Sequence, residues 1–238
     1  SLKLLNKLGI KKKLISLHDY NEKIIIQRLS SEIHNRNIVL ISDAGSPLIS
    51  DPGFKLIKHC IDNKINITSI PGPTSIIPSL QLSGLPINEF YFAGFFPKVK
   101  KQMIEFLNQI RKNEKTSVFF VSSHKIKICL DLIEIKMDDR LISVSKELTK
   151  VNEKVFRGLA GEVKDKININ KNNLKGEFVV AVGGNIEEKK PSAELKNNEI
   201  IIKKLLAKFS LTDVVQIVHK LSGIRKSEVY KWVLNIKK

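Results

Sequence analysis

Short apolar runs that end in turns rich in glycine and proline recur along this chain, and this pattern most narrows the folds it can adopt. Residues 38–41 are Ile-Val-Leu-Ile and lead into the turn at residues 43–47. Residues 65–70 form a second such run, which ends in the turn at residues 71–73. A segment with helical spacing of apolar residues follows each turn. Alternation of strand, turn and helix is typical of an α/β protein. We therefore expect strands at residues 38–41 and 65–70 in a mostly parallel sheet.

A second group of apolar runs follows after a break in the pattern. Residues 117–121, 141–144 and 178–182 predict three further strands, and residues 125–135 predict a helix between the first two. The break itself, residues 86–101, holds proline and several lysines, which is typical of a connection between domains. The sequence therefore predicts two α/β domains joined by this segment.

The end of the chain predicts helices without strands. Ser210 and Ser227 are suitable N-cap residues, and the Ser-Gly pair at residues 222–223 separates the two helices. Apolar residues recur at near-helical spacing on both helices, so the two can pack together. This hairpin either binds RNA through its basic residues or serves packing or dimerisation. The expected organisation is a domain at residues 1–90, a second at 91–184, a linker at 185–199 and a basic helical hairpin at 200–238.

An excess of positive charge narrows the choice of partners. The 238 residues include 41 basic and 24 acidic side chains, which gives a formal net charge of +17. Such a chain attracts polyanions, and nucleic acid is the first candidate. Biased coding in an AT-rich genome is the alternative explanation, since only six of the basic residues are arginine. That bias explains the preference for lysine better than it explains the scarcity of acidic residues.

The sequence also argues against several classes of protein. No apolar run reaches the roughly 18–20 residues that a membrane helix needs. Cys60 and Cys129 are the two cysteines, and the five histidines lack the spacing of metal ligands. We therefore expect a cytoplasmic protein without disulfides, without a metal centre and without a membrane segment.

The turns after the predicted strands are candidate ligand sites. Residues 43–47, 71–75 and 183–184 each follow the carboxyl end of a predicted strand, where open α/β sheets bind their ligands. Glycine there lets the backbone approach a ligand closely, and Asp43 can accept hydrogen bonds from a ribose or an amino group. Neither a Walker motif nor G-x-G-x-x-G occurs. The pattern indicates a nucleotide-like ligand held without a phosphate cradle, and ordinary turns are the alternative.

Residues 42–53, Ser-Asp-Ala-Gly-Ser-Pro-Leu-Ile-Ser-Asp-Pro-Gly, make the first turn far more specific. They resemble the S-D-A-G-T-P-x-I-x-D-P-G signature of the ribosomal RNA small subunit methyltransferase I family, which belongs to the tetrapyrrole methylase superfamily. Lys146 stands where that family has arginine, and residues 119–125 keep little of its F-Y-E-x-P-H-R motif. Further motifs similar to those of the family follow in order at residues 71–73, 83–86, 92–98, 146–153 and 175–178, so the resemblance extends over nearly the whole chain.

The resemblance implies a fold, a cofactor and a substrate. It implies two α/β domains with S-adenosylmethionine in the cleft between them, a homodimer, and methylation of a cytidine 2′-hydroxyl in the decoding centre of small-subunit (16S) ribosomal RNA. It also implies that the family's first strand and a loop lie upstream of Ser1. A tetrapyrrole methyltransferase on the same fold and a non-catalytic RNA-binding protein are the alternatives. By carry-over of the matching turns, the cofactor lies against Asp43, Ala44, Gly45, Ser46, Pro47, Thr74, Ser75, Phe120, Val121, Gly176 and Glu177.

Two charged residues of one matching motif are the candidates for catalysis. Transfer of a sulfonium methyl group depends mainly on alignment, and a positioned base assists removal of the hydroxyl proton. Glu147 and Lys150 follow a predicted strand and are our candidates for this role. A structural ion pair or a phosphate clamp is the alternative. The residues expected to bind RNA are Lys98, Lys100, Lys101, Arg225, Lys226 and Lys231.

Overall fold

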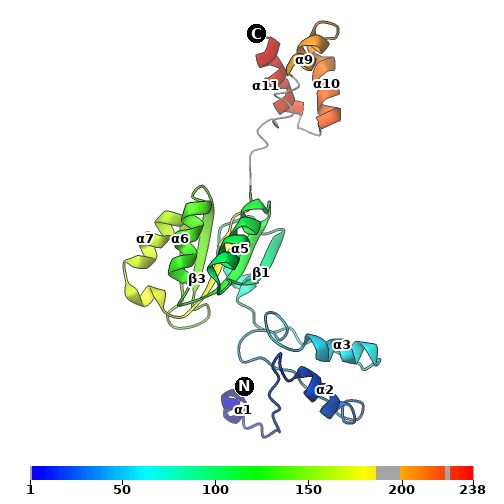
Figure 1. Ribbon diagram of the computed structural model, residues 1–238, viewed down its shortest axis with the longest axis vertical. Helices are drawn as coiled ribbons and strands as arrows, with labels where there is room; N and C mark the ends of the chain where they lie inside the picture. The colour runs from blue at the N-terminus through cyan, green and yellow to red at the C-terminus, as the bar shows by residue number, and fades with distance from the viewer. Residues whose placement is uncertain (1, 186–198, 223–225, 238) are drawn as a thin grey trace. The chain divides into compact units, whose positions relative to one another are not determined.

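The computed structural model describes residues 2–185, 199–222 and 226–237 (Figure 1). Contacts between residues divide the chain into two compact units, residues 1–185 and residues 186–238. The first unit contains every described strand, and the second contains helices. The expected boundary between residues 90 and 91 falls inside the first unit and stays a prediction.

A five-stranded mixed sheet organises the first unit. Its strands are β1 (Phe90–Phe95), β2 (Thr116–Ser122), β3 (Leu141–Lys146), β4 (Lys154–Leu159) and β5 (Glu177–Val182), in the order β1-β2-β5-β3-β4. β1 and β2 are parallel, whereas the other three neighbouring pairs are antiparallel. The expected mostly parallel sheet is therefore wrong. β3 and β4 follow each other without a crossover helix, and β5 inserts between β2 and β3, which alternation of strands and helices does not reveal.

The two faces of the sheet are covered differently. A layer of three helices covers one face: α5 (Lys100–Lys112), α6 (Ile126–Lys136) and α7 (Ala160–Asn168) (Figure 1). Leu107 and Ile133 from this layer pack against Phe119 of β2 in the main core. The short helix α4 (Ile76–Gln81) packs on the other face, where Leu80 lies in a cluster with Val118. Successive side chains of β2 thus enter different cores, as strand geometry requires.

The elements predicted in this unit are confirmed where their apolar runs are buried. The three strands at residues 117–121, 141–144 and 178–182 and the helix at 125–135 appear with shifts of one or two residues at their ends. The connection expected at residues 86–101 contains β1 and the start of α5, and its role between two domains stays a prediction. Phe92 of β1 packs against Phe120 with ring centroids 5.2 Å apart. Gly94, with φ of 75°, lies where the β1–β2 register shifts. The sequence pattern of such an irregular strand resembles that of a linker.

The segment before β1 is mostly irregular. It contains α1 (Leu2–Lys7), α2 (Glu22–Leu29) and α3 (Phe54–Asp62) besides α4. The buried carboxylate of Glu22 accepts hydrogen bonds from the backbone N–H groups of Lys55 (3.0 Å) and Leu56 (3.4 Å), so α2 caps the start of α3.

The strands expected at residues 38–41 and 65–70 are wrong, because neither segment pairs with a strand among the described residues. Most of their apolar side chains stay exposed, for example 78% for Val39 and 86% for Ile70. An apolar run becomes a strand only where a neighbour takes up its backbone hydrogen bonds.

The described residues of the second unit form the helices α9 (Glu199–Leu206), α10 (Leu211–Ser222) and α11 (Lys226–Lys237). The expected packing of the two last helices is confirmed, since Val214 and Val218 of α10 share a core with Val229 of α11. α9 was not expected, and it adds Ile202 to that core. Ser210 caps α10, because its Oγ accepts a hydrogen bond from the Asp213 N–H at 3.2 Å.

Two details of the expected hairpin differ. Ser227 lies inside α11, which begins at Lys226, so its expected N-cap role is wrong. Gly223 of the expected break, Arg225 and most of the expected linker at 185–199 lie outside the described residues. No helix in the described ranges is long and apolar enough to cross a membrane.

Candidate functional site

The two turns expected to hold the cofactor lie against each other. The Ser46 hydroxyl donates a hydrogen bond to the carbonyl oxygen of Pro73 at 3.2 Å. The first turn is closed by the Ser42 hydroxyl, which donates to the Asp51 carboxylate and also accepts the Ala44 N–H at 3.3 Å. Segments more than twenty residues apart in sequence therefore form one continuous surface of backbone and small side chains.

Glycines keep that surface open. Gly45 has φ of 76°, and a Cβ atom built on it would meet its nearest neighbour, the Pro73 carbonyl oxygen, only at 3.8 Å. A Cβ atom on Gly72 would likewise lie 3.8 Å from Ser46 Oγ. Each glycine thus leaves free a small volume that any other residue would fill. A ligand can approach the backbone closely here.

The turns are anchored near the sheet through their neighbours in sequence. A Cβ atom on Gly94 of β1 would lie 4.0 Å from the hydroxyl of Ser50, so the first loop reaches the end of β1. The second turn leads into α4, whose first N–H, that of Ile76, donates to Thr74 Oγ1 at 3.3 Å. α4 packs on the same sheet face as Phe120. This brings Thr74 and Ser75 to the face of the sheet on which Phe120 lies.

Phe120 and Val121, both expected to contact the cofactor, point to opposite faces of β2. Phe120 is partly exposed on the α4 face, between Phe92 and Phe95. Val121 is 2% exposed and belongs to the core beneath the three-helix layer. A ligand on the α4 face can therefore meet Phe120 through its ring and Val121 through its backbone.

The acidic and basic candidates form a compact cluster at the ends of β3 and β5. Lys150 Nζ lies 3.0 Å from Glu147 Oε1 and 3.0 Å from Glu177 Oε2. Glu147 Oε1 also accepts the backbone N–H of Glu177 at 2.8 Å, and the Glu147 N–H donates back to the Glu177 carbonyl at 2.9 Å. Gly176 is required beside this pair, since its φ is 106° and a Cβ atom would lie 2.6 Å from Glu147 Cγ.

These contacts fix the charges of the cluster. The backbone hydrogen bond from Glu177, followed by the hydrogen bond from Lys150, lowers the pKa of Glu147 below its ordinary value. The hydrogen bonds to Glu177 and Glu147 raise the pKa of Lys150 above its ordinary value. Both groups are therefore charged near neutral pH. A carboxylate stabilised in this way is a weaker proton acceptor than a free one.

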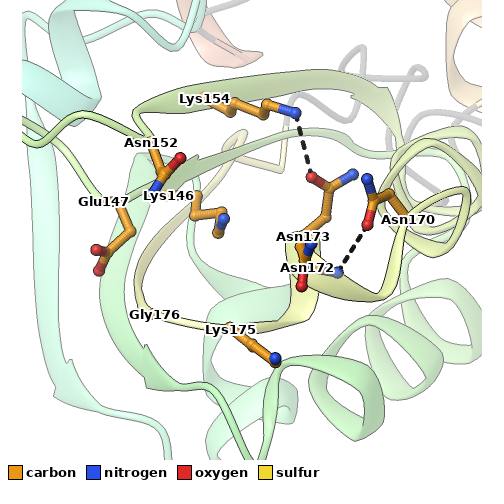
Figure 2. Close-up of a pocket in the computed structure, with 9 residues that line it drawn as sticks. All are labelled: Lys146, Glu147, Asn152, Lys154, Asn170, Asn172, Asn173, Lys175 and Gly176. Carbon is orange, nitrogen blue, oxygen red and sulfur yellow. Dashed lines mark hydrogen bonds between the residues drawn. The ribbon is translucent and has the colours of Figure 1, made fainter.

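A polar hollow of about 370 Å³ opens beside the cluster (Figure 2). Glu147 and Gly176 form part of its wall, and lysines and asparagines form the rest. Lys146 lies within this group and is 5% exposed, although it ends β3 (Figure 2). Sequence reasoning missed this hollow. The available signal was the run rich in asparagine and lysine at residues 168–173, a composition that is typical of a loop and does not by itself indicate a site.

The residues expected to bind RNA are distributed over both units. Lys98 and the first two residues of α5, Lys100 and Lys101, are exposed on the first unit. Lys226 and Lys231 are exposed on α11 of the second unit. Within the described ranges, no three side chains of histidine, cysteine, aspartate or glutamate are grouped to hold a metal ion.

Comparison with known proteins identifies relatives over nearly the full chain. The sequence profile of the Tetrapyrrole (Corrin/Porphyrin) Methylases matches residues 9–164. Ribosomal RNA small subunit methyltransferase I of Escherichia coli O157:H7 is 32% identical over 235 residues, which are 97% of this chain and 81% of that protein. The protein of the same name from Vibrio cholerae serotype O1 is 35% identical in an alignment of 240 positions, gaps included, that covers 98% of this chain and 81% of that protein.

Solved structures share the fold at low sequence identity. A diphthine synthase superposes with a TM-score of 0.57 and 15% identity, covering 76% of this chain and 73% of that one. A cobalt precorrin-4 methyltransferase superposes with a TM-score of 0.52 and 16% identity, covering 77% and 79% of the two chains. At such identity these structures show the fold alone.

Proposed function

Because the chain belongs to the tetrapyrrole (corrin/porphyrin) methylase family, and within it to the ribosomal RNA small subunit methyltransferase I group, we propose that it methylates small-subunit ribosomal RNA. The methyl donor is S-adenosylmethionine, and the acceptor is the 2′-hydroxyl of a cytidine ribose in the decoding centre. The observation that carries this proposal is the match of 97–98% of the chain to two relatives of that name.

The glycine-lined turns fit the cofactor by their shape. Ser46 and Pro73 hold the two turns together, and the space that a Cβ atom would fill at Gly45 remains free. When bound, S-adenosylmethionine supplies an electrophilic methyl group on a sulfonium whose leaving group is a neutral thioether. The surface made by residues 43–47 and 74–75 holds and orients it, and Phe120 and residues 176–177 complete the site.

Glu147 and Lys150 support the reaction best by positioning. Lys150 is bonded to two carboxylates and has a raised pKa, so it does not accept a proton near neutral pH. Glu147 has a lowered pKa and accepts a backbone N–H through the same oxygen that meets Lys150. These contacts favour the ion-pair interpretation, in which the pair fixes the loop after β3 relative to residue 177. Proton removal by Glu147 stays a prediction.

The positive charge supports an RNA substrate over a small tetrapyrrole. Lys98, Lys100 and Lys101 of the first unit and Lys226 and Lys231 of the second are exposed and available to phosphate groups. Contacts of this kind position an RNA without selecting a base. The homodimer implied by the resemblance stays a prediction, which light scattering of the purified protein measures.

The decisive experiment offers three substrates to the purified protein with methyl-labelled S-adenosylmethionine. Small ribosomal subunits, protein-free small-subunit rRNA and a tetrapyrrole precursor are compared under identical conditions. We expect label in RNA, in a cytidine whose 3′ linkage resists alkaline hydrolysis because its 2′-oxygen is methylated. Label in the tetrapyrrole would instead establish the small-molecule activity. Tight RNA binding without any transfer would establish a binding protein.

A further inference from the structure

The hollow beside Glu147 has a buried lysine within it. Lys146 ends β3 and is 5% exposed, while Lys154 and Lys175 at the edge of the hollow are exposed. Figure 2 shows the Lys146 side chain inside the ring of lining residues, with the carboxylate of Glu147 directed away from it. Lysine is among the residues that proteins bury least, unless a partner compensates its charge.

In the part of the chain that the structure describes, the charge of Lys146 is compensated only in part, through electrostatic attraction by the Glu147 carboxylate. No hydrogen bond or ion pair reaches its ammonium there, and the carboxylate next to it in sequence is engaged with Lys150 at 3.0 Å. Other partly buried lysines of the same unit are paired. Lys164, for example, lies 3.2 Å from Asp131 and also contacts Glu134. A lysine that is compensated only in part can gain a further anionic partner in the hollow.

The wall of the hollow supplies the donors that an anion needs. Lys154 Nζ donates to Asn173 Oδ1 at 3.4 Å, which leaves further N–H groups of this ammonium available. Asn170 Oδ1 accepts the Asn172 N–H at 2.9 Å, so the side-chain NH2 of Asn170 remains as a hydrogen-bond donor. Among the residues that line the hollow, three are lysines and one, Glu147, is a carboxylate that Lys150 also pairs with. The wall is therefore positive and rich in donors.

We propose that this hollow binds a phosphodiester group of the RNA substrate, with Lys146 at its floor and Lys154 and Lys175 at its rim. The inference rests on the proposed function. A phosphate has several strong acceptor oxygens and a negative charge, and both match the three ammonium groups and the amides around them. Glu147 and Gly176 border the hollow and also the Lys150 cluster. A phosphate held there would fix the RNA backbone beside residues 176–177.

The experiment measures binding of a decoding-region fragment of small-subunit rRNA as potassium chloride concentration is raised. Loss of one phosphate contact reduces the slope of log affinity against log salt by about 0.7–0.9. We expect that reduction, with weaker binding, for Lys146→Met, whose side chain keeps a similar length without charge. Lys146→Arg keeps the charge and should keep the slope. Lys127→Met removes a charge from the exposed face of α6 and is the matched control, with the wild-type slope.

Further measurements separate the outcomes. If Lys146→Met does not fold, Lys175→Met at the exposed rim takes its place with the same expected loss of slope. Calorimetry with S-adenosylmethionine should give the wild-type dissociation constant for each variant. A wild-type slope in folded Lys146→Met and Lys175→Met would overturn the proposal.

Two mixed results also have a definite meaning. Binding of inorganic phosphate that depends on Lys146, seen by calorimetry without any change in the RNA slope, would assign the hollow to a free anion and overturn the RNA proposal. The second mixed result combines two measurements: Lys146→Met weakens RNA binding, but the wild-type protein transfers no methyl group. This result would overturn the proposed function and support this inference.

Discussion

Strained backbone gathers in the loops of the candidate site. Of the five described residues other than glycine with positive φ, four lie in two of its loops: Leu48, Ser50, Glu147 and Thr149. Such conformations are costly for residues with a Cβ atom and persist where surrounding contacts impose them. The imposed contacts are visible, since Thr149 N–H donates to Glu153 at 2.6 Å and Glu147 is bonded to Glu177. We infer that these loops are held in shape for binding.

Gly45 gives the most direct test of the cofactor surface. Gly45→Val fills the space beside the Pro73 carbonyl, and we expect it to abolish S-adenosylmethionine binding in calorimetry. It also imposes strain of about 1–2 kcal/mol, because φ is 76°. Gly84→Val is the matched control, since Gly84 has φ of 73° and nothing within 4 Å of its added Cβ atom. Both variants should lose similar stability, but only the first should lose binding. Micromolar binding by folded Gly45→Val would place the cofactor elsewhere.

The Glu147 contacts predict how stability depends on pH. The pKa of Glu147 is lowered in the folded protein, so its stabilisation is present above the ordinary carboxyl pKa and is lost as pH falls through the folded value. Glu147→Gln should therefore lower the free energy of unfolding near pH 7 by about 1 kcal/mol, the net worth of one hydrogen bond. The difference from wild type should shrink as pH falls toward 3.

Urea unfolding at a series of pH values measures this difference. Glu105→Gln changes an exposed carboxylate of α5 and should match wild type throughout. A deficit in Glu147→Gln that stays constant from pH 7 to pH 3 would mean that the glutamate acts through packing rather than through its charge.

At the scale of elements, the sequence predicts what is buried and misses what depends on neighbours. The strand at residues 178–182 is apolar without interruption, because it lies between β2 and β3 with both faces covered. Residues 38–41 are just as apolar, yet no described strand pairs with them. β4 was missed because Lys154, Arg157 and Gly158 break its pattern at an edge of the sheet. The expected strand direction was also wrong, because the local sequence pattern does not show which strands pair.

The candidate site divides in the same way. The turns at residues 43–47 and 71–75 could be predicted from glycine and proline, and the Ser46–Pro73 contact joins them. The pairing of Glu147 with Lys150 could be anticipated from their separation of three residues, but the involvement of Glu177 depends on β5 lying beside β3. The burial of Lys146 could not be anticipated, since lysine at a strand end ordinarily faces water.

The Ser210 cap of α10 can be tested by substitution. Ser210→Ala removes the oxygen that accepts the Asp213 N–H, and we expect the second unit to lose about 1 kcal/mol of stability. Trp232, the single tryptophan of the chain, packs against the core of this unit, so its fluorescence reports unfolding there. Ser227→Ala lies within α11 and caps nothing, which makes it the matched control with little change. Equal unfolding midpoints for the two variants would contradict the capping role.

At the scale of the whole molecule, the two units have separate cores. The core of the first is built from the sheet and helices α5 to α7, and the core of the second from α9 to α11. Separate cores imply that one unit can be removed without unfolding the other. The second unit also carries six exposed lysines on its described residues: Lys203, Lys204, Lys208, Lys220, Lys226 and Lys231. This division of the chain allows binding of RNA and binding of the cofactor to be tested apart.

Removal of residues 199–238 tests what the second unit contributes to RNA binding. Each lost phosphate contact lowers the slope of log RNA affinity against log salt by about 0.7–0.9. If the second unit contacts several phosphates, its removal should therefore lower this slope by a large part of its full value. The truncated protein should bind S-adenosylmethionine as the full chain does, because the expected cofactor residues all lie in the first unit. Its methylation of RNA should show a raised KM with kcat largely preserved, since these contacts bring the RNA to the site without taking part in transfer.

The competing explanation is that the apolar faces of α9 to α11 stabilise the first unit or a second copy of the chain. That explanation predicts a lower melting temperature, a changed oligomer in light scattering, or activity that no RNA concentration restores. Any of these results would contradict the RNA-binding role of the second unit.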